Sequence, residues 1–353
     1  MSQRVVVGMS GGVDSSVAAA LLVEEGHEVI GVTMHLAGSD SRCCSLDDAD
    51  DARRVAERLG IRFYVANYKD QFREEVTLPF ADAYLAGRTP IPCVTCNKRF
   101  KFDHLLERAR ALGADAVATG HYARIEQGEA GPTLHRGTDA SKDQAYFLFN
   151  LSPEQLAHVR FPLGAMTKEQ VRDRARALGL ATAEKPESQE ICFVPNGDYA
   201  SVVEQLRPEA LPGEGDVVDE SGQVLAKHGG IHHFTVGQRK GLGVSGKERR
   251  YVVELDAERN RVIVGPEGSL GCTETRVEAV GWTREPVPTE AFRASVQVRH
   301  QHGGAMATVE PDGPRAAKVS FDEPVRAVAP GQAAVFFDGD RVLGGGWLAG
   351  RVG

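Results

Sequence analysis

The stretch VVVGMSGGVDSS at residues 5–16 places glycines, serines and an aspartate directly after a short apolar run. Val5, Val6 and Val7 predict a buried strand, and the alanine- and leucine-rich residues 17–25 predict a helix. The alternation continues, with strands expected at 28–36, 61–67 and 115–120 and helices at 46–60, 69–86 and 97–113. Strands that alternate with helices indicate an α/β fold with a doubly wound parallel sheet.

In such a sheet, ligands bind beyond the carboxyl ends of the strands, where the opening turn, Met34 and Gly120 are expected to lie. Gly11 and Gly12 let the backbone approach a ligand closely, and the following helix points its N–H groups and positive dipole end at the same place. The turn also offers the hydroxyls of Ser10, Ser15 and Ser16. We therefore expect it to bind an anion, above all phosphate; the alternative is a capped turn without a ligand.

No lysine follows these glycines, so the turn does not fit the phosphate loop G-x-x-x-x-G-K-[ST]. Conversion of ATP to ADP is therefore disfavoured. Asp14 is the unusual member, because phosphates repel a carboxylate unless it caps the helix or helps to hold a divalent cation. This residue implies Mg²⁺.

Beyond about residue 205 the pattern changes to frequent glycine and proline and to short alternating runs. RYVVELD and NRVIVGP predict antiparallel strands, and ASVQVRHQ, RAAKVSF and GQAAVFF predict a small β-barrel from about residue 277 onward. A chain of 353 residues suggests two or three domains. We expect a catalytic domain at 1–204, a small β-rich domain at 205–273 and the β-barrel at 274–353.

The composition, 42% hydrophobic and 25% charged, is that of an ordinary soluble globular protein. The start does not resemble a signal peptide and no apolar run reaches the length of a membrane span, so the cytoplasm is the expected location. The formal net charge of −8 does not indicate a nucleic-acid partner, so any RNA would have to bind local basic patches.

Six cysteines without a secretion signal favour thiol or metal chemistry over a disulfide scaffold. Cys93 and Cys96 form a C-x-x-C pair, which fits a redox pair, half of a metal site, a nucleophile with a neighbour that tunes it, or a chance pairing. The basic, aromatic helix start NKRFK directly after Cys96 favours its thiolate, and it could also contact an RNA backbone or be a solvated charge run. Cys192 lies far away in ESQEICFV, and Cys43, Cys44 and Cys272 have no assigned role.

The string SGGVDSS resembles the pyrophosphate loop of N-type ATP pyrophosphatases, which form adenylated intermediates. In chain order, SGGVDSS, CNKRFKF, ATGHYA, KDQAYFL, SQEICF and HHFTVGQRKGLG resemble the tRNA-specific 2-thiouridylases over residues 5–245, and PGQAAVFF extends the likeness into the last domain. The resemblance implies an ATP-dependent tRNA sulfurtransferase that adenylates the C2 oxygen of wobble uridine 34 and replaces it with sulfur from a protein persulfide. AMP and pyrophosphate are the implied products, and tRNA and a sulfur-carrier or cysteine desulfurase protein the implied partners.

The resemblance also implies roles for individual residues. Cys96 is the implied nucleophile and Cys192 the implied persulfide carrier, with a disulfide between them as a product. The residues implied to bind ATP are Gly8, Met9, Ser10, Gly11, Gly12, Val13, Asp14, Ser15, Met34 and Gly120. The implied tRNA contacts are Ile91, Pro92 and Cys93 at the target base, and His121, Lys142, Asp143, Gln144, Arg299, His300 and Gln332 elsewhere.

One position departs from the family pattern. Where the family has an aspartate close to the target base, this chain has Cys93. Together with Cys96 and Cys192 this gives three thiols, the number that would hold a [4Fe–4S] cluster with one iron open, as in related cluster-dependent tRNA thiolases. A persulfide route and a cluster route therefore compete for the same residues.

Other interpretations fit single features. Amidating or ligating enzymes that share the opening loop have no use for Cys96 and Cys192, and a non-catalytic RNA-binding module leaves SGGVDSS unexplained. By sequence alone Met34 fits a core position, and His121 fits a role that merely satisfies backbone groups. The adjacent His232 and His233 could suggest a metal, but no partner spacing supports one, so a structural or RNA-facing role is preferred.

Overall fold

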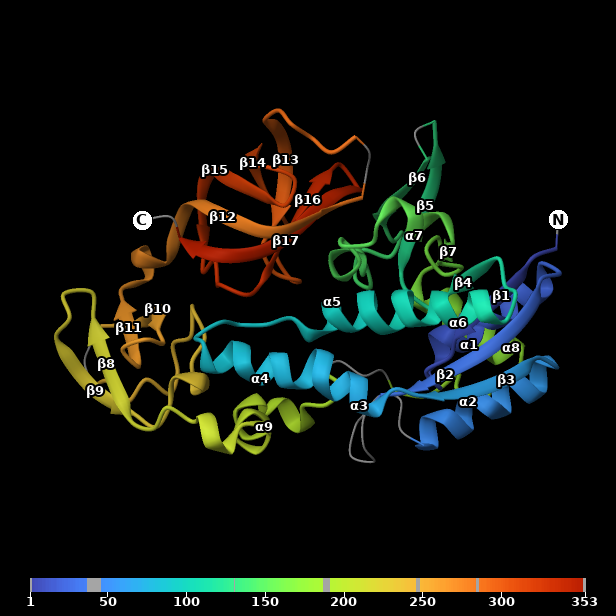
Figure 1. The fold of residues 1–353 in the computed structure, drawn as a ribbon, viewed down its shortest axis with the longest axis horizontal. Coiled ribbons are helices and arrows are strands. Elements are labelled where there is room, and N and C mark those ends of the chain that lie inside the picture. The colour runs from blue at the N-terminus through green and yellow to red at the C-terminus, as the bar shows by residue number, and fades with distance from the viewer. Residues whose placement is uncertain are drawn as a thin grey trace.

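The computed structural model describes residues 2–36, 46–129, 131–186, 191–245, 248–283 and 286–351. It has three parts: a parallel sheet with helices, a four-stranded sheet, and a barrel formed by the C-terminal strands (Figure 1). This arrangement confirms the expected α/β class with two smaller β-rich parts. No helix in these described ranges is long and apolar enough to cross a membrane.

The first part alternates strands and helices as the sequence predicts. Its sheet strands, in the order β3-β2-β1-β4-β7, are β1 (Arg4–Gly8), β2 (Glu28–His35), β3 (Arg62–Asn67), β4 (Ala116–Ala118) and β7 (Val159–Arg160). All pairings in this sheet are parallel. Its helical segments are α1 (Val13–Glu24), α2 (Leu46–Leu59), α3 (Lys69–Phe72), η1 (Arg73–Thr77), α4 (Leu78–Leu85), α5 (Pro92–Cys96), η2 (Asn97–His104), α6 (Leu105–Ala111), η3 (Ala145–Phe147), α7 (Pro153–Ala157), α8 (Lys168–Ala177), η4 (Pro195–Gly197), α9 (Tyr199–Leu206) and η5 (Pro208–Ala210).

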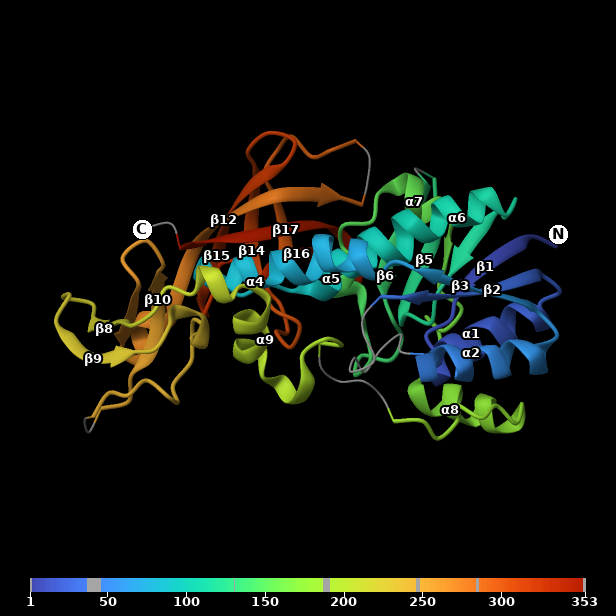
Figure 2. The ribbon, with the colours of Figure 1, turned by 60° about the horizontal axis from the view of Figure 1, so that its bottom comes forward.

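Helices cover both faces of the sheet. Figure 2 shows α1, α2 and α8 on one face and α6 on the other. Alternate residues of β1 supply the two cores, because successive side chains of a strand point to opposite faces. Val6 joins the core that contains α6, whereas Val5 and Val7 join the core that contains α1 and α8. Burial on both faces explains why β1 reads as an unbroken apolar run.

The helix predicted at 17–25 begins earlier, at Val13. Gly12 precedes it in an extended conformation. The hydroxyls of Ser15 and Ser16 both donate to the Gly12 carbonyl, at 3.2 and 2.8 Å. These two serines therefore lie in the first turn of α1, where their hydroxyls hydrogen-bond to the backbone carbonyl just before the helix.

The helix predicted to begin at Asn97 instead begins at Pro92, because proline has the φ angle that a first helical position needs. α5, η2 and α6 follow one another to Ala111, and α3, η1 and α4 form the segment predicted at 69–86. Cys93, and not Cys96, therefore lies in the first helical turn. The expectation that a helix N-terminus favours the Cys96 thiolate loses its basis.

The C-terminal strands form a closed antiparallel barrel, which confirms the predicted β-barrel. The strand order is β12-β15-β14-β13-β16-β17, and pairing of β12 with β17 closes it. Buried residues such as Val277, Val296 and Val319 fill its core. The strands are β12 (Gly271–Trp282), β13 (Phe292–Gln297), β14 (Ala305–Pro311), β15 (Ala316–Arg326), β16 (Ala333–Asp338) and β17 (Arg341–Arg351).

A second sheet, in the order β10-β11-β8-β9, lies between the first part and the barrel in sequence. RYVVELD and NRVIVGP form the antiparallel pair β10–β11, as predicted. Its elements are β8 (Gly215–Asp219), β9 (Val224–His228), η6 (Ile231–His233), β10 (Tyr251–Asp256), β11 (Arg261–Gly265) and η7 (Glu267–Leu270). A hairpin that the sequence did not predict, β5 (Ala123–Gly128) and β6 (Gly131–Arg136), reaches from the first part to the barrel, where His135 pairs with Arg341 of β17.

Arg136, at the end of β6, holds the barrel on the first part. Its guanidinium donates to the carboxylate of Asp143 at 2.7 Å and to Oε1 of Gln297 in β13 at 2.8 Å. The same guanidinium lies 3.6 Å from the ring centroid of Phe337 in β16, a cation–π contact. Asp143 also accepts two backbone N–H bonds. One largely buried ion pair therefore joins two parts of the molecule.

We expect Asp143→Ala to lower the free energy of unfolding by about 3 kcal/mol, because it leaves the Arg136 charge without its carboxylate partner and two backbone N–H groups without their acceptor. Chemical denaturation followed by circular dichroism measures this loss. Glu129→Ala removes an exposed carboxylate from the same part and should change the free energy by less than about 0.5 kcal/mol. Equal stability of the Asp143 variant and the wild type would contradict the role of the pair.

Candidate functional site

The loop at residues 8–12 connects β1 to α1 and is tightly packed on two sides. Gly11 has a φ of +69°, and a Cβ there would lie 2.2 Å from the Asp48 carbonyl oxygen of α2. A Cβ on Gly120, beyond β4, would lie 2.7 Å from the Ser15 nitrogen. Only glycine fits both positions. The predicted ATP residues 8–15 and Gly120 therefore meet at the carboxyl edge of the sheet.

The carboxylate of Asp14 is paired with a lysine that the sequence analysis missed. Nζ of Lys168 lies 2.8 and 2.9 Å from the two carboxylate oxygens, and the Tyr122 hydroxyl donates to one of them at 2.8 Å. The Lys168 side chain is only 11% exposed. Helix α8 therefore places a largely buried ammonium group next to the glycine-rich loop. The glycine-rich loop has no lysine of its own, and this cation reaches it from 154 residues further along the chain.

Contacts at the start of α8 fix the position of Lys168. Thr167 and Gln170 form a capping box around it. Its backbone N–H donates to Oδ2 of Asp139 at 2.9 Å. The Ser141 hydroxyl, followed by the N–H of Lys168, lowers the pKa of the Asp139 carboxyl, which keeps this acceptor ionised. The string TKEQ therefore predicts the start of a helix. No local sequence pattern predicts that Lys168 contacts the glycine-rich loop.

Cys96 and Cys192 pack against one apolar cluster. Met34, near the carboxyl end of β2 and only 7% exposed, belongs to this cluster, and its contact with ATP stays a prediction. The structure thus brings together two cysteines that are distant in sequence, near the edge of the sheet that carries the loop. The buried members of the cluster are Met34, Leu36, Phe72, Val76 and Phe100.

Phe193 anchors the segment that carries Cys192. Its ring makes edge contacts with Phe72 and Phe80, at centroid distances of 5.9 and 5.1 Å. The sequence suggested that a mobile segment must bring Cys192 to Cys96, whereas both already contact the same cluster. Residues 187–190, which hold the first part of the SQEICF motif, lie outside the described residues.

The other cysteines divide into three cases. Cys93 lies one helical turn before Cys96 in α5 and is half-buried. Cys272 is buried in the barrel core, and its thiol donates to the Glu274 carbonyl at 3.1 Å, which indicates a packing role. Cys43 and Cys44 lie outside the described residues. Cys96 and Cys192 are not in disulfides, so the expected disulfide between them is not supported.

His121 is buried, with 6% of its surface exposed. Nζ of Lys101 lies 3.4 Å from Nε2, and because lysine only donates, Nδ1 carries the proton and donates to Oγ1 of Thr119 at 2.6 Å. Burial, and then the charge of Lys101, hold the pKa of His121 well below its usual value. The ring is therefore neutral and internally bonded, and its contact with tRNA stays a prediction.

Among residues 142–144, predicted to contact tRNA, the side chains of Asp143 and Gln144 bond within the protein. Gln144 Oε1 accepts the backbone N–H of Tyr122 at 3.1 Å, and Tyr122 in turn donates to Asp14. Asp143 is bound to Arg136, as described above. Lys142 is half-buried. Their contact with RNA stays a prediction.

Arg299 and Gln332 line a cleft of about 400 Å³ to which all three parts of the molecule contribute. Nε2 of Gln332 donates to the Thr89 carbonyl at 3.0 Å, and Arg299 donates to the Arg326 carbonyl at 2.9 Å. Thr89 shortly precedes Ile91, the first residue predicted to meet the target base. The lining residues are Thr89, Thr235, Val236, Gly237, Arg299, Arg326, Ala327, Ala329 and Gln332.

His300 connects the barrel to the helix that carries Cys96. Its ring contacts the ring of Phe147 at a centroid distance of 4.6 Å, with the two planes tilted by 36°. The Phe147 carbonyl accepts from Nδ2 of Asn97 at 3.2 Å, and Gln297 donates to the His300 carbonyl at 2.8 Å. A single aromatic ring therefore lies between the barrel loop and the residue that follows Cys96.

Comparison with known proteins gives one consistent result. Family profiles match the tRNA methyl transferase HUP domain at residues 3–196, the tRNA methyl transferase PRC-barrel domain at 201–266 and the aminomethyltransferase beta-barrel domain at 272–348. The tRNA-specific 2-thiouridylase MnmA of Geobacter metallireducens is 52% identical over 357 residues, covering 98% of this chain and 96% of that protein. The protein of the same name from Geotalea uraniireducens is 51% identical, covering 98% and 95%. The chain belongs to the tRNA-specific 2-thiouridylase family.

As a tRNA-specific 2-thiouridylase, the chain is a tRNA sulfurtransferase, an enzyme of tRNA 2-thiolation with a pyrophosphatase-type loop. Among solved structures, the U34-tRNA thiolase NcsA from Methanococcus maripaludis with its [4Fe-4S] cluster is similar with a TM-score of 0.36 and 18% identity, over 59% of this chain and 72% of that chain. This likeness is too low to assign a cluster to this member of the 2-thiouridylase family.

We expect His121→Gln to make this 2-thiouridylase less sensitive to acid. The depressed pKa means that, as the pH falls through about 6.5, the unfolded chain takes up a proton that the folded chain does not. Stability from this residue is therefore present above about pH 6.5 and falls below it, by up to about 1.4 kcal/mol per pH unit.

Urea denaturation at pH 7.5 and pH 5.5 measures the effect. The wild type should lose more stability between the two than the variant does, and His158→Gln, at an exposed histidine, should behave like the wild type. Equal losses in wild type and His121→Gln would contradict the neutral, buried state of the ring.

Proposed function

We propose that this enzyme converts wobble uridine 34 of tRNA to 2-thiouridine, with ATP as activator of the C2 oxygen and a persulfide on Cys192 as sulfur source. The observation that carries this proposal is the packing of Cys96 and Cys192 against one cluster that also contains Met34, beside the glycine-rich loop. Activation of an oxygen and delivery of a sulfur must occur at the same carbon. A nucleotide loop and two thiols at one edge of the sheet meet that requirement.

The first step joins the C2 oxygen of the uridine to the α-phosphate of ATP and breaks the bond to pyrophosphate. The backbone of residues 8–12 and the start of α1 would bind the phosphates. Lys168 supplies the cation that the loop lacks, since its Nζ already lies at the Asp14 carboxylate. Asp14 is the carboxylate that would hold Mg²⁺, which neutralises phosphate charge when bound. Adenylation matters because AMP leaves C2 easily, whereas the carbonyl oxygen does not.

The second step moves one sulfur atom. The terminal sulfur of the Cys192 persulfide forms a bond to C2, and the C2–O bond to AMP breaks. The Cys96 thiolate then attacks Sγ of Cys192, so that the sulfur–sulfur bond to the substrate breaks and 2-thiouridine leaves. A disulfide between Cys96 and Cys192 remains, and an external dithiol must reduce it before a new persulfide is loaded. Both cysteines are half-buried against the apolar cluster, which covers part of each side chain.

The cleft of Arg299 and Gln332 is the face that would receive tRNA. It opens beside Thr89, so an RNA bound there lies next to the segment that leads to Ile91, Pro92 and Cys93. Arg299 and Arg326 give this cleft positive charge in a chain whose formal net charge is −8. Local basic groups of this kind bind phosphates.

A [4Fe–4S] route is the second candidate. Cys93 and Cys96 are three residues apart in one helix, so they share a face of it, and Cys192 packs near Cys96. These three thiolates fit the donor set of a cluster with one open iron, which would supply a site for an external sulfide. The two routes differ in what they require of Cys93.

We expect Lys168→Met to lower kcat/KM for AMP formation by about 30-fold, because a hydrogen bond from a charged group contributes roughly 1.5–3 kcal/mol. Release of AMP and pyrophosphate in the presence of tRNA and Mg²⁺ measures it. Lys318→Met removes an exposed lysine from β15 and is the matched control. A folded Lys168→Met enzyme with wild-type AMP formation would show that this ammonium does not serve the phosphates.

For the cysteines, we expect Cys96→Ser and Cys192→Ser to abolish 2-thiouridine formation, measured by nucleoside mass spectrometry with a persulfide donor, while ATP cleavage persists. Cys93→Ala, one turn from Cys96, is the matched control and should retain most of the activity. Loss of activity in Cys93→Ala, together with near-stoichiometric four-iron content in the anaerobically reconstituted wild type, would favour the cluster route. A wild type that forms no 2-thiouridine with either sulfur source would contradict the proposed function.

A further inference from the structure

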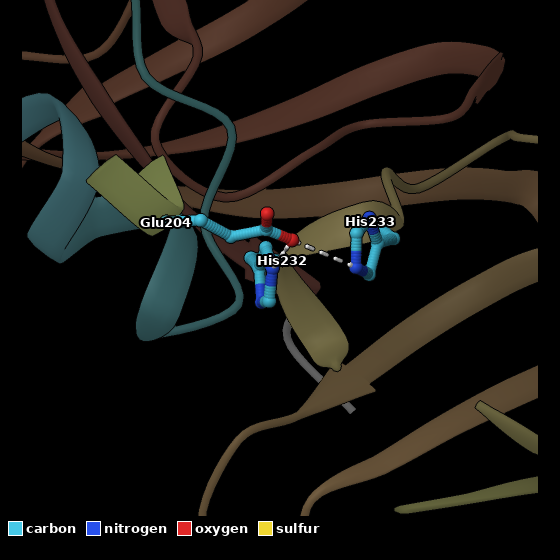
Figure 3. Close-up of side chains that lie close together, drawn as sticks. All are labelled: Glu204, His232 and His233. Atoms are coloured by element: carbon cyan, nitrogen blue, oxygen red, sulfur yellow. Dashed lines mark hydrogen bonds and ion pairs between the residues drawn. The ribbon is translucent and has the colours of Figure 1, made fainter. Parts of the chain in front are cut away.

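Glu204, His232 and His233 bring their side chains together where α9 of the first part meets η6 of the second. Figure 3 shows the Glu204 carboxylate directed at both imidazole rings. Its Oε1 lies 3.3 Å from Nε2 of His232 and 3.5 Å from Nε2 of His233. Of the residues that the structure describes, only these three form a group of at least three histidine, cysteine or acidic ligand atoms within 4.8 Å of one another.

The distances fit ligands around a metal better than they fit ion pairs. Charge-assisted hydrogen bonds between nitrogen and a carboxylate are about 2.7–2.9 Å long, shorter than either separation here. In a tetrahedral site with metal–ligand bonds of about 2.0–2.1 Å, neighbouring ligand atoms lie about 3.3 Å apart. The observed 3.3 and 3.5 Å are therefore close to the edges of such a tetrahedron.

His232 provides a second, independent observation. Only 2% of its surface is exposed, and its Nδ1 is a buried atom without a hydrogen-bond partner. The ring packs closely against Gly230, because a Cβ on that residue would lie 2.4 Å from Cε1 of His232. A buried ring nitrogen without a partner costs free energy, and a strong bond at the other nitrogen, Nε2, would offset this cost without removing it. A metal on Nε2 supplies such a bond, whereas a carboxylate at 3.3 Å supplies a weak one.

We propose that Glu204, His232 and His233 bind a divalent first-row transition metal, with Zn²⁺ as the best fit, through Oε1 and two Nε2 atoms, leaving one position for water. Imidazole and carboxylate ligands suit this class of ion. The inference is independent of the chemistry proposed at the thiols. Glu204, the third ligand, was not predicted from the sequence because it lies 28 residues before His232, outside any local metal-binding spacing.

The bound ion would act as a clamp. α9 belongs to the first part, where Val203 packs in a cluster with Phe80, Tyr84 and Val194. Val194 closely follows Cys192, and Phe193 also packs against that cluster. A metal that ties Glu204 to η6 therefore fixes the helix on which the Cys192 segment rests to the four-stranded sheet.

The test uses the full chain with its thiols alkylated by iodoacetamide, because cysteines also bind Zn²⁺. Isothermal titration calorimetry with Zn²⁺ should give about one ion per chain, and Zn²⁺ should raise Tm by several degrees, as expected for a ligand that binds only the folded state. Glu204→Gln and His233→Ala change half-exposed side chains, so the fold should survive them. Each should weaken Zn²⁺ binding by at least about tenfold and remove the Tm shift.

Two matched controls accompany these variants. Glu254→Gln, at an exposed glutamate of β10, and His158→Ala, at an exposed histidine, should bind Zn²⁺ like the wild type. Absence of saturable binding in the alkylated wild type, or binding equal to wild type in both Glu204→Gln and His233→Ala, would overturn the proposal. One bound ion that leaves Tm unchanged would overturn the clamp.

Discussion

The ion pair between Lys168 and Asp14 is the interaction on which the nucleotide end of this enzyme depends. It joins the first residue of α8 to the first turn of α1, two helices on the same face of the sheet. Tyr122 adds a third contact from the segment after β4. Because a largely buried ammonium needs its carboxylate, the three segments are held in one arrangement before any ligand binds. A binding site ordered in advance loses less entropy when its ligand arrives.

The apolar cluster around Phe72 and Phe100 orders the two cysteines, as the pair of Lys168 and Asp14 orders the nucleotide end. It gathers Cys96 from α5 and Cys192 from the segment before α9, which no local pattern relates. Edge-to-face contacts of Phe193 hold the second segment in place. The molecule therefore uses charge to order the phosphate end and burial of aromatic rings to order the sulfur end.

The sequence predicts this fold well where structure is local. β1 and β2 are apolar runs bounded by glycine or polar residues, and the barrel strands alternate in the usual way, so both were expected. The hairpin β5–β6 was missed because its strands mix charged and apolar residues without a clear period. The start of α5 was misplaced because Pro92 was assigned to a turn, although proline also suits a first helical position.

Long-range pairs explain what else the sequence did not predict about the site. Lys168 meets Asp14, and Glu204 meets His232, only after distant elements have packed, so neither spacing resembles a motif. Family resemblance located the loop and the two cysteines, since those lie in short strings. It also predicts tRNA contacts for Asp143 and His121, which stay predictions, since these side chains bond to Arg136 and Thr119 in the structure.

The contact between the rings of His300 and Phe147 has a consequence for fidelity. The Phe147 carbonyl is the acceptor for Asn97, the residue after Cys96, and Gln297 ties the His300 loop to Arg136. The barrel loop and the nucleophile are thus placed by one shared set of contacts. If tRNA contacts His300, as the family resemblance predicts, an RNA that displaces this ring also disturbs Phe147, whose carbonyl accepts from Asn97. In that case a misplaced substrate would also shift the residue next to Cys96, so that poor binding and a misplaced thiol would occur together.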